Sequence, residues 1–114
     1  MKLIILTIGF LTLQSCSTRT DKVFSAYDEL HSIILYENGN DFKILYNGVN
    51  SATGKYDLKS DTILLIYTEN QFKEFDPNEV LSRKLLINKQ VKKVSSLDGK
   101  PFCANIHRDK RENI

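Results

Sequence analysis

Two stretches of alternating apolar and polar residues predict a β-hairpin over residues 32–46. The runs 32–37 and 40–46 flank the dipeptide Asn38-Gly39. An Asn-Gly pair between two strand-like runs is the strongest short-range hairpin signal, because both residues tolerate positive φ angles. The turn sets the register, which places two apolar pairs on one face of the sheet: Leu35 opposite Phe42, and Ile33 opposite Ile44.

A second hairpin is predicted from residues 54–58 and 62–67, with Ser60-Asp61 as the turn. The expected register pairs Leu58 with Ile63 and Tyr56 with Leu65. The run 62–67 is apolar on both faces, which is typical of a strand that is central in its sheet or covered on both sides. The segment that joins the two hairpins, residues 47–53, is rich in turn formers and is expected to be a loop.

Weaker signals follow in the last third of the chain. Asp76, Pro77 and Glu79 are the residue types that begin a helix, as the N-cap, the first helical residue and the third. This helix is expected to be no longer than a turn or two. The runs 83–87 and 90–94 predict two more short strands.

The segment before the first hairpin, residues 21–31, is ambiguous. A short helix with Asp21 as its cap is favoured, since four apolar residues fall at helical spacing: Val23, Tyr27, Leu30 and Ile34. A strand is the alternative, because valine, tyrosine and phenylalanine also suit sheets.

These elements predict a mainly β fold, an antiparallel meander of five to seven short strands with one or two short helices. The meander is expected to form a small curled sheet or barrel. Four tyrosines about ten residues apart agree with the strand-plus-turn period of such a fold, and an aromatic binding row is the alternative: Tyr36, Tyr46, Tyr56 and Tyr67. Eight residues are expected in the core: Ile33, Leu35, Phe42, Ile44, Tyr56, Leu58, Ile63 and Leu65.

The N-terminus has the pattern of an export signal. Met1-Lys2 precedes an apolar run from Leu3 to Leu13. A membrane-spanning helix needs roughly 20 apolar residues. The shorter run fits the apolar core of a secretory signal peptide, which is about 7–15 residues long.

The residues after this run, Leu13-Gln14-Ser15-Cys16, resemble the lipobox of bacterial lipoproteins. The resemblance implies that diacylglycerol is attached to the Cys16 thiol, that a peptidase cuts before Cys16, and that the new amine is acylated, for example with palmitate. It divides the chain into a cleaved signal peptide (1–15), a lipidated tether (16–20), a single β-rich domain (21–106) and a polar tail (107–114). The expected location is a bacterial membrane, namely the outer membrane on its periplasmic side, because no acidic cluster follows Cys16.

Residues 32–95 also resemble small, uncharacterised β-rich bacterial lipoproteins. The similarity lies in Asp41-Phe42-Lys43-Ile44, in Gly54-Lys55-Tyr56-Asp57-Leu58 and in Asp61-Thr62-Ile63-Leu64-Leu65. This resemblance agrees with the expected fold, but it implies no activity.

Few residues suggest catalysis. His31 and His107 are the only histidines, the side chains suited to acid–base chemistry near neutral pH, and no phosphate loop, nucleophile elbow or paired metal motif occurs. Cys103 remains free if Cys16 is lipidated, and it is expected to be a buried small hydrophobe. An intermolecular disulfide or a reactive thiol is the alternative, and Cys103 with His107 is the one pair that could form a thiol or metal site.

Charge is distributed unevenly. Residues 20–82 carry five lysines and eleven acids, a net charge of −6, whereas residues 83–114 carry nine basic residues and three acids, a net charge of +6. The two regions are expected to attract each other within the fold, with an anionic partner as the alternative.

These observations favour a non-catalytic, lipid-anchored binding or envelope-structural module without metal or cofactor. Its expected partners are membrane lipid through Cys16, and anionic lipid or an envelope protein at the basic C-terminal third, but not nucleic acid. The alternatives are a small periplasmic thiol enzyme that uses Cys103 and His107, and an immunity or inhibitor lipoprotein.

Overall fold

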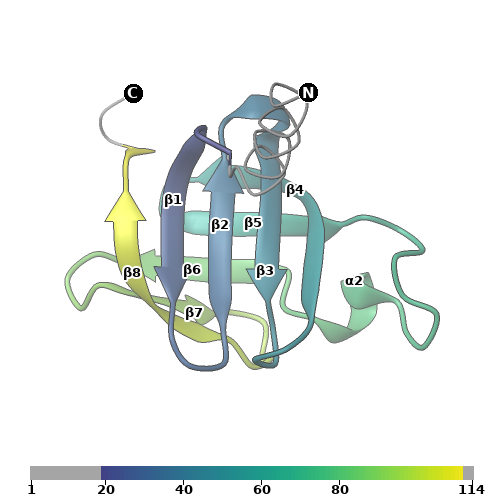
Figure 1. The fold of residues 1–114 in the computed structure, drawn as a ribbon. Coiled ribbons are helices and arrows are strands. Elements are labelled where there is room, and N and C mark those ends of the chain that lie inside the picture. The colour runs from purple at the N-terminus through teal and green to yellow at the C-terminus, as the bar shows by residue number, and fades with distance from the viewer. Residues whose placement is uncertain (1–18, 112–114) are drawn as a thin grey trace, which may run out of the picture.

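The computed structural model describes residues 19–111, which form a closed antiparallel barrel (Figure 1). Each strand pairs with the next one in the sequence, and the last strand returns to pair with the first. The strands are β1 (Lys22–Tyr27), β2 (Ser32–Tyr36), β3 (Asp41–Leu45), β4 (Ser51–Lys59), β5 (Thr62–Tyr67), β6 (Lys84–Asn88), β7 (Lys93–Ser96) and β8 (Cys103–Asp109). A 3-10 turn, η1 (Asn38–Asn40), joins β2 to β3, and a short helix, α2 (Pro77–Val80), lies between β5 and β6.

This architecture confirms the predicted fold class, a mainly β antiparallel meander, and of the two expected forms, a curled sheet or a barrel, it is the barrel. The barrel has eight strands rather than five to seven, because both ends of the domain add a strand. The first is β1, so the strand alternative for residues 21–31 is correct and the helix is wrong. The second is β8, which extends to Asp109. Residues 107–109 therefore belong to the barrel and not to a polar tail.

Two strands turn the corners of the barrel. Residues 51–55 of β4 pair with β3, whereas residues 54–59 pair with β5. In the same way, residues 103–105 of β8 pair with β7, and residues 105–109 pair with β1. As a result β1, β2 and β3 run crosswise to β5 and β6 on the other side of the barrel (Figure 1).

The registers of both hairpins are as predicted. Leu35 lies opposite Phe42, and Ile33 opposite Ile44; Leu58 lies opposite Ile63, and Tyr56 opposite Leu65. The first turn differs in one detail, since the positive φ angles fall on Gly39 (72°) and Asn40 (52°) and not on Asn38.

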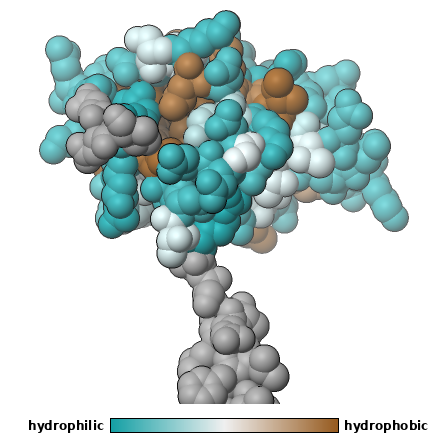
Figure 2. Space-filling view, turned by 90° about the horizontal axis from the view of Figure 1, so that it is seen from above, coloured by the Kyte–Doolittle hydropathy of each residue, from teal (hydrophilic) through white to brown (hydrophobic). Residues whose placement is uncertain are grey.

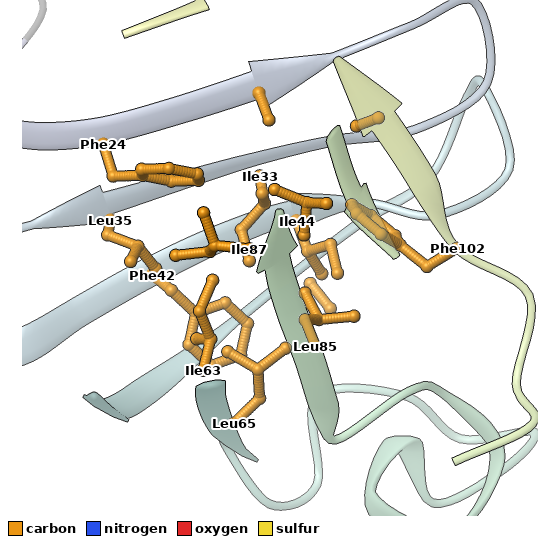
Figure 3. Close-up of a cluster of buried hydrophobic side chains, with 14 of the residues drawn as sticks. Phe24, Ile33, Leu35, Phe42, Ile44, Ile63, Leu65, Leu85, Ile87 and Phe102 are labelled. Atoms are coloured by element: carbon orange, nitrogen blue, oxygen red, sulfur yellow. The ribbon is translucent and has the colours of Figure 1, made fainter. Parts of the chain in front are cut away.

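Apolar side chains from all eight strands fill the barrel (Figure 3). Phe24, Phe42 and Leu85 are among the largest fully buried side chains. Six of the eight predicted core residues are buried, while Tyr56 and Leu58 are half-buried and pack against the cluster. In β1 a bulge turns both Val23 and Phe24 into the interior, which breaks the strict alternation of a strand. The packed interior contributes about 25 cal/mol for each Å² of apolar surface removed from water.

The run 90–94, which was predicted to be a strand, is divided differently in the structure. Residues 89–92 form the turn between β6 and β7, and β7 begins only at Lys93. The Asn88 side chain accepts hydrogen bonds from the backbone N–H groups of Gln90 and Val91, which favours a turn at this place.

Candidate functional site

Cys16 lies outside the described residues, and the first described residue, Arg19, contacts the barrel through its side chain. The Arg19 guanidinium donates to the Asp21 carboxylate at 2.7 and 2.9 Å and to the Asp41 carboxylate at 3.0 Å. It also lies over the ring of Tyr36, 4.0 Å from the ring centroid. Of the predicted tether, residues 16–20, at least Arg19 is therefore held against the start of β3.

The basic side chains of Arg19 and Lys55 lower the pKa of the neighbouring carboxylates. The hydrogen bond from Arg19 lowers the pKa of Asp21 to about 2, while hydrogen bonds from Lys55 and Arg19 lower the pKa of Asp41. The Lys55 ammonium lies 2.6 Å from Asp41 Oδ1. Both carboxylates are therefore ionised at neutral pH, and the Arg19 clamp, formed by Arg19, Asp21, Asp41 and Tyr36, remains intact there.

Cys103 and His107, the one predicted catalytic pair, do not meet. Both lie in β8, and both are exposed. Four residues of extended chain span roughly 13 Å, so the imidazole cannot reach the thiol. The expectation that Cys103 is buried is wrong, because the neighbours Phe102 and Ala104 point into the barrel and Cys103 points out.

The two histidines have other neighbours. His31 Nδ1 lies 3.2 Å from the backbone oxygen of Cys103, and its ring packs on Phe102 at a centroid distance of 5.0 Å. His107 Nδ1 lies 3.4 Å from the Tyr27 hydroxyl. Each imidazole thus joins β8 to a neighbouring segment, which is a structural role.

A partly buried polar network, in which Tyr67 and Ser82 are buried and Asp98 is exposed, lies at the start of β6. The Tyr67 hydroxyl donates to the Ser82 carbonyl at 2.6 Å, and the hydroxyls of Ser82 and Ser96 both donate to Asp98 Oδ1, at 2.9 and 2.7 Å. Partial burial would by itself raise the pKa of Asp98, but hydrogen bonds from Arg83 N–H, Ser96 and Ser82 together lower it to about 2. These contacts brace the β7–β8 turn against the start of β6.

The connection between β5 and β6, residues 68–83, is attached to two open strand edges by side-chain amides. The Gln71 amide accepts from Thr53 N–H at 3.1 Å and donates to Thr53 O at 2.9 Å. The Asn78 amide makes the equivalent pair with Tyr67, at 2.9 and 3.1 Å. Each amide replaces a missing strand partner, so the connection protects edges that would otherwise be open to another chain. Sequence reasoning missed this role, since neither amide belongs to a motif.

The same connection covers one end of the barrel with aromatic rings. Phe72 stacks on Phe75 with 5.1 Å between centroids, and both meet the ring of Tyr46 edge-on. Beside these rings lies a pocket of about 160 Å³, whose walls include Tyr46, Tyr67 and Phe102.

The basic residues of the last third are only partly neutralised by the fold. Arg111 pairs with Asp109 at 2.6 Å and with Asp61 of the acidic region at 3.5 Å. Lys92 and Arg108 form no ion pair with a described residue. They line a groove of about 320 Å³ between the β6–β7 turn and β8.

Among residues 19–111, no group of three or more His, Cys, Asp or Glu side chains is placed to hold a metal ion. Within the same range, no helix is long and apolar enough to cross a membrane. The described residues define a small, closed antiparallel barrel with an apolar interior. Comparison of the chain with protein-family models, with curated proteins and with solved structures finds no match.

Proposed function

We propose that this protein is a non-catalytic binding module of the bacterial cell envelope, tethered by lipid on Cys16. The observation that carries the proposal is the packed interior of the barrel. Because side chains fill the space that larger barrels use for a ligand, recognition has to take place on the outside or at the ends.

The position of Arg19 supports a defined orientation of the module. The Arg19 clamp lies at the end of the barrel that carries η1, and Figure 2 views this end, where mainly hydrophilic residues surround a smaller group of hydrophobic ones. The β1–β2 and β3–β4 connections lie at the other end (Figure 1). A lipid on Cys16 would hold the clamped end near the membrane and direct the opposite end away from it.

The end that faces away carries apolar loop residues. Leu30, between β1 and β2, is 56% exposed, and Val49, between β3 and β4, is 82% exposed. Exposed apolar tips on neighbouring loops suit contact with an envelope protein. A tether raises the local concentration of the two partners, so that weak binding at these tips is sufficient.

The anchor is tested by labelling cells with radioactive palmitate. We expect that Cys16→Ala abolishes the label and that Cys103→Ala, the matched control that removes the other cysteine, retains it. Label that persists in Cys16→Ala would show that the anchor is assigned wrongly.

The binding role is tested by crosslinking the tagged protein in its native envelope. We expect one protein to be captured by wild type and by Cys103→Ala, and to be lost or strongly reduced with Cys16→Ala and with Val49→Asp. A captured secreted enzyme would identify the module as an inhibitor. If capture is the same in all four forms, neither the tether nor the distal loops contribute, and the proposal fails.

A further inference from the structure

The groove beside β8 is built from two segments, the turn between β6 and β7 and residues 106–109 of β8. Figure 1 shows the turn between β6 and β7 next to β8, and the backbone N–H of Ile106 donates to Lys92 O at 2.9 Å. This bond fixes the turn against the strand. The groove has a volume of about 320 Å³ and is lined by Lys89, Lys92, Ile106, His107, Arg108 and Asp109.

The backbone at Lys92 is unusual for a lysine. Its φ angle is +57°, in the left-handed region that glycine and asparagine adopt most readily. This angle belongs to the β6–β7 turn, as the positive φ angles of Ser60 and Asn70 belong to other turns. The Lys92 side chain lines the groove.

The groove is electropositive. Lys92 and Arg108 form no ion pair with a described residue, so their charges are available to a ligand. The one acid in the lining, Asp109, is held by Arg111 through contacts of 2.6 and 2.8 Å, which lower its pKa and offset its charge. The region therefore carries excess positive charge from Lys92 and Arg108.

We propose that this groove binds a phosphate group, with the Arg108 guanidinium as a two-pronged donor and the Lys92 ammonium as a point charge. These are the donors that proteins use for phosphate oxygens. The inference deepens the proposed binding function and rests on it only for the biological context. The phosphate belongs either to an anionic lipid headgroup or to a soluble molecule, since both present the same oxygens.

The experiment uses the full-length protein, purified in non-ionic detergent and labelled for NMR. In one arm, inorganic phosphate is titrated; in the other, the micelles are doped with phosphatidylglycerol or, as the phosphate-free reference, with diacylglycerol. We expect amide shifts confined to residues 89–92 and 106–109. Shifts with inorganic phosphate alone assign a soluble ligand, and shifts with phosphatidylglycerol but not with diacylglycerol assign a headgroup.

The variant Lys92→Gly separates binding from folding, because glycine suits the backbone angle at this position. We expect it to be at least as stable as wild type and to bind about fivefold more weakly, which corresponds to ~1 kcal/mol for one basic residue at an anionic surface. The control Lys43→Ala removes an exposed lysine from the outer face of β3 and should bind within twofold of wild type.

The proposal is overturned if neither probe shifts the groove, if shifts spread evenly over all basic residues, or if Lys92→Gly binds as well as wild type. Failure of the palmitate test would not affect this measurement, because the titration does not depend on a lipid attached to Cys16. The two proposals can therefore fail separately.

Discussion

Replacing Gly54 with alanine is predicted to destabilise the barrel severely, although one methyl group is the only change. Gly54 lies at the corner of β4, where it pairs with Phe42 of β3 and with Tyr67 of β5. A Cβ at this position would lie 2.1 Å from the Ile66 carbonyl oxygen and 2.8 Å from Tyr67 Cα. Both atoms belong to the backbone of β5, so the clash cannot be relieved by turning a side chain.

The expected loss in the free energy of unfolding depends on which atoms have to move to make room for the methyl group. Overpacking that displaces side chains and some backbone typically costs about 1–3 kcal/mol. Here relief requires β4 and β5 to separate at the corner, so we expect a loss of at least ~3 kcal/mol in the free energy of unfolding. Domains of this size have a total of only about 5–15 kcal/mol. The loss corresponds to a fall in Tm of roughly 12 °C or more.

A matched control is Gly99→Ala in the β7–β8 turn. Gly99 has a φ angle of +80°, but a Cβ there would meet nothing within 4 Å. Its cost is the left-handed backbone alone, about 1 kcal/mol. Urea denaturation followed by far-UV circular dichroism and tyrosine fluorescence gives both values, since the chain has no tryptophan. If Gly54→Ala is no less stable than Gly99→Ala, the steric argument for the corner is refuted.

Three further predictions concern the polar groups. The pKa of Asp98 is lowered to about 2 in the folded protein, so the contribution of this carboxylate to stability is present above pH 4 and is lost as the pH falls towards 2. The variant Asp98→Asn should lose less stability over this range, as measured by acid denaturation followed by circular dichroism. Tyr67→Phe leaves the buried Ser82 carbonyl without the hydroxyl that donates to it, and should lower the free energy of unfolding by about 1–2 kcal/mol in urea titrations. The exposed Cys103 should react readily with a maleimide in the folded protein, and its reaction rate should be the same in wild type and in His107→Ala. A slower reaction in His107→Ala would contradict the separation of the thiol from the imidazole.

Much of the strand pairing could be predicted from the sequence, because it depends on neighbours in the chain. The Asn-Gly turn and the alternation around it specify which residues of β2 and β3 face each other, and the same holds for β4 and β5. The start of α2 was also predictable, since its signal is local: the Asp76 carboxylate accepts from Asn78 N–H at 2.9 Å.

Two strands were missed for different reasons. In β1 the helical spacing depended on Tyr27 and Leu30, which are exposed, whereas the bulge turns both Val23 and Phe24 inward and breaks the alternation of a strand. In β8 only Ala104 and Ile106 alternate with exposed neighbours before the register shifts between Ile106 and Arg108, so the apolar pattern is too short to predict a strand.

The candidate site depends on contacts between residues that are distant in the sequence, which only the tertiary structure decides. The extended conformation of β8 keeps the Cys103 thiol away from the His107 imidazole, and the Ile106–Lys92 hydrogen bond brings the β6–β7 turn to the strand that carries Arg108. The sequence alone determined that the last third of the chain is basic and that its strands pair in order. The corners of the barrel set how distant strands approach each other. They therefore decide which basic residues pair with an acid and which line a groove.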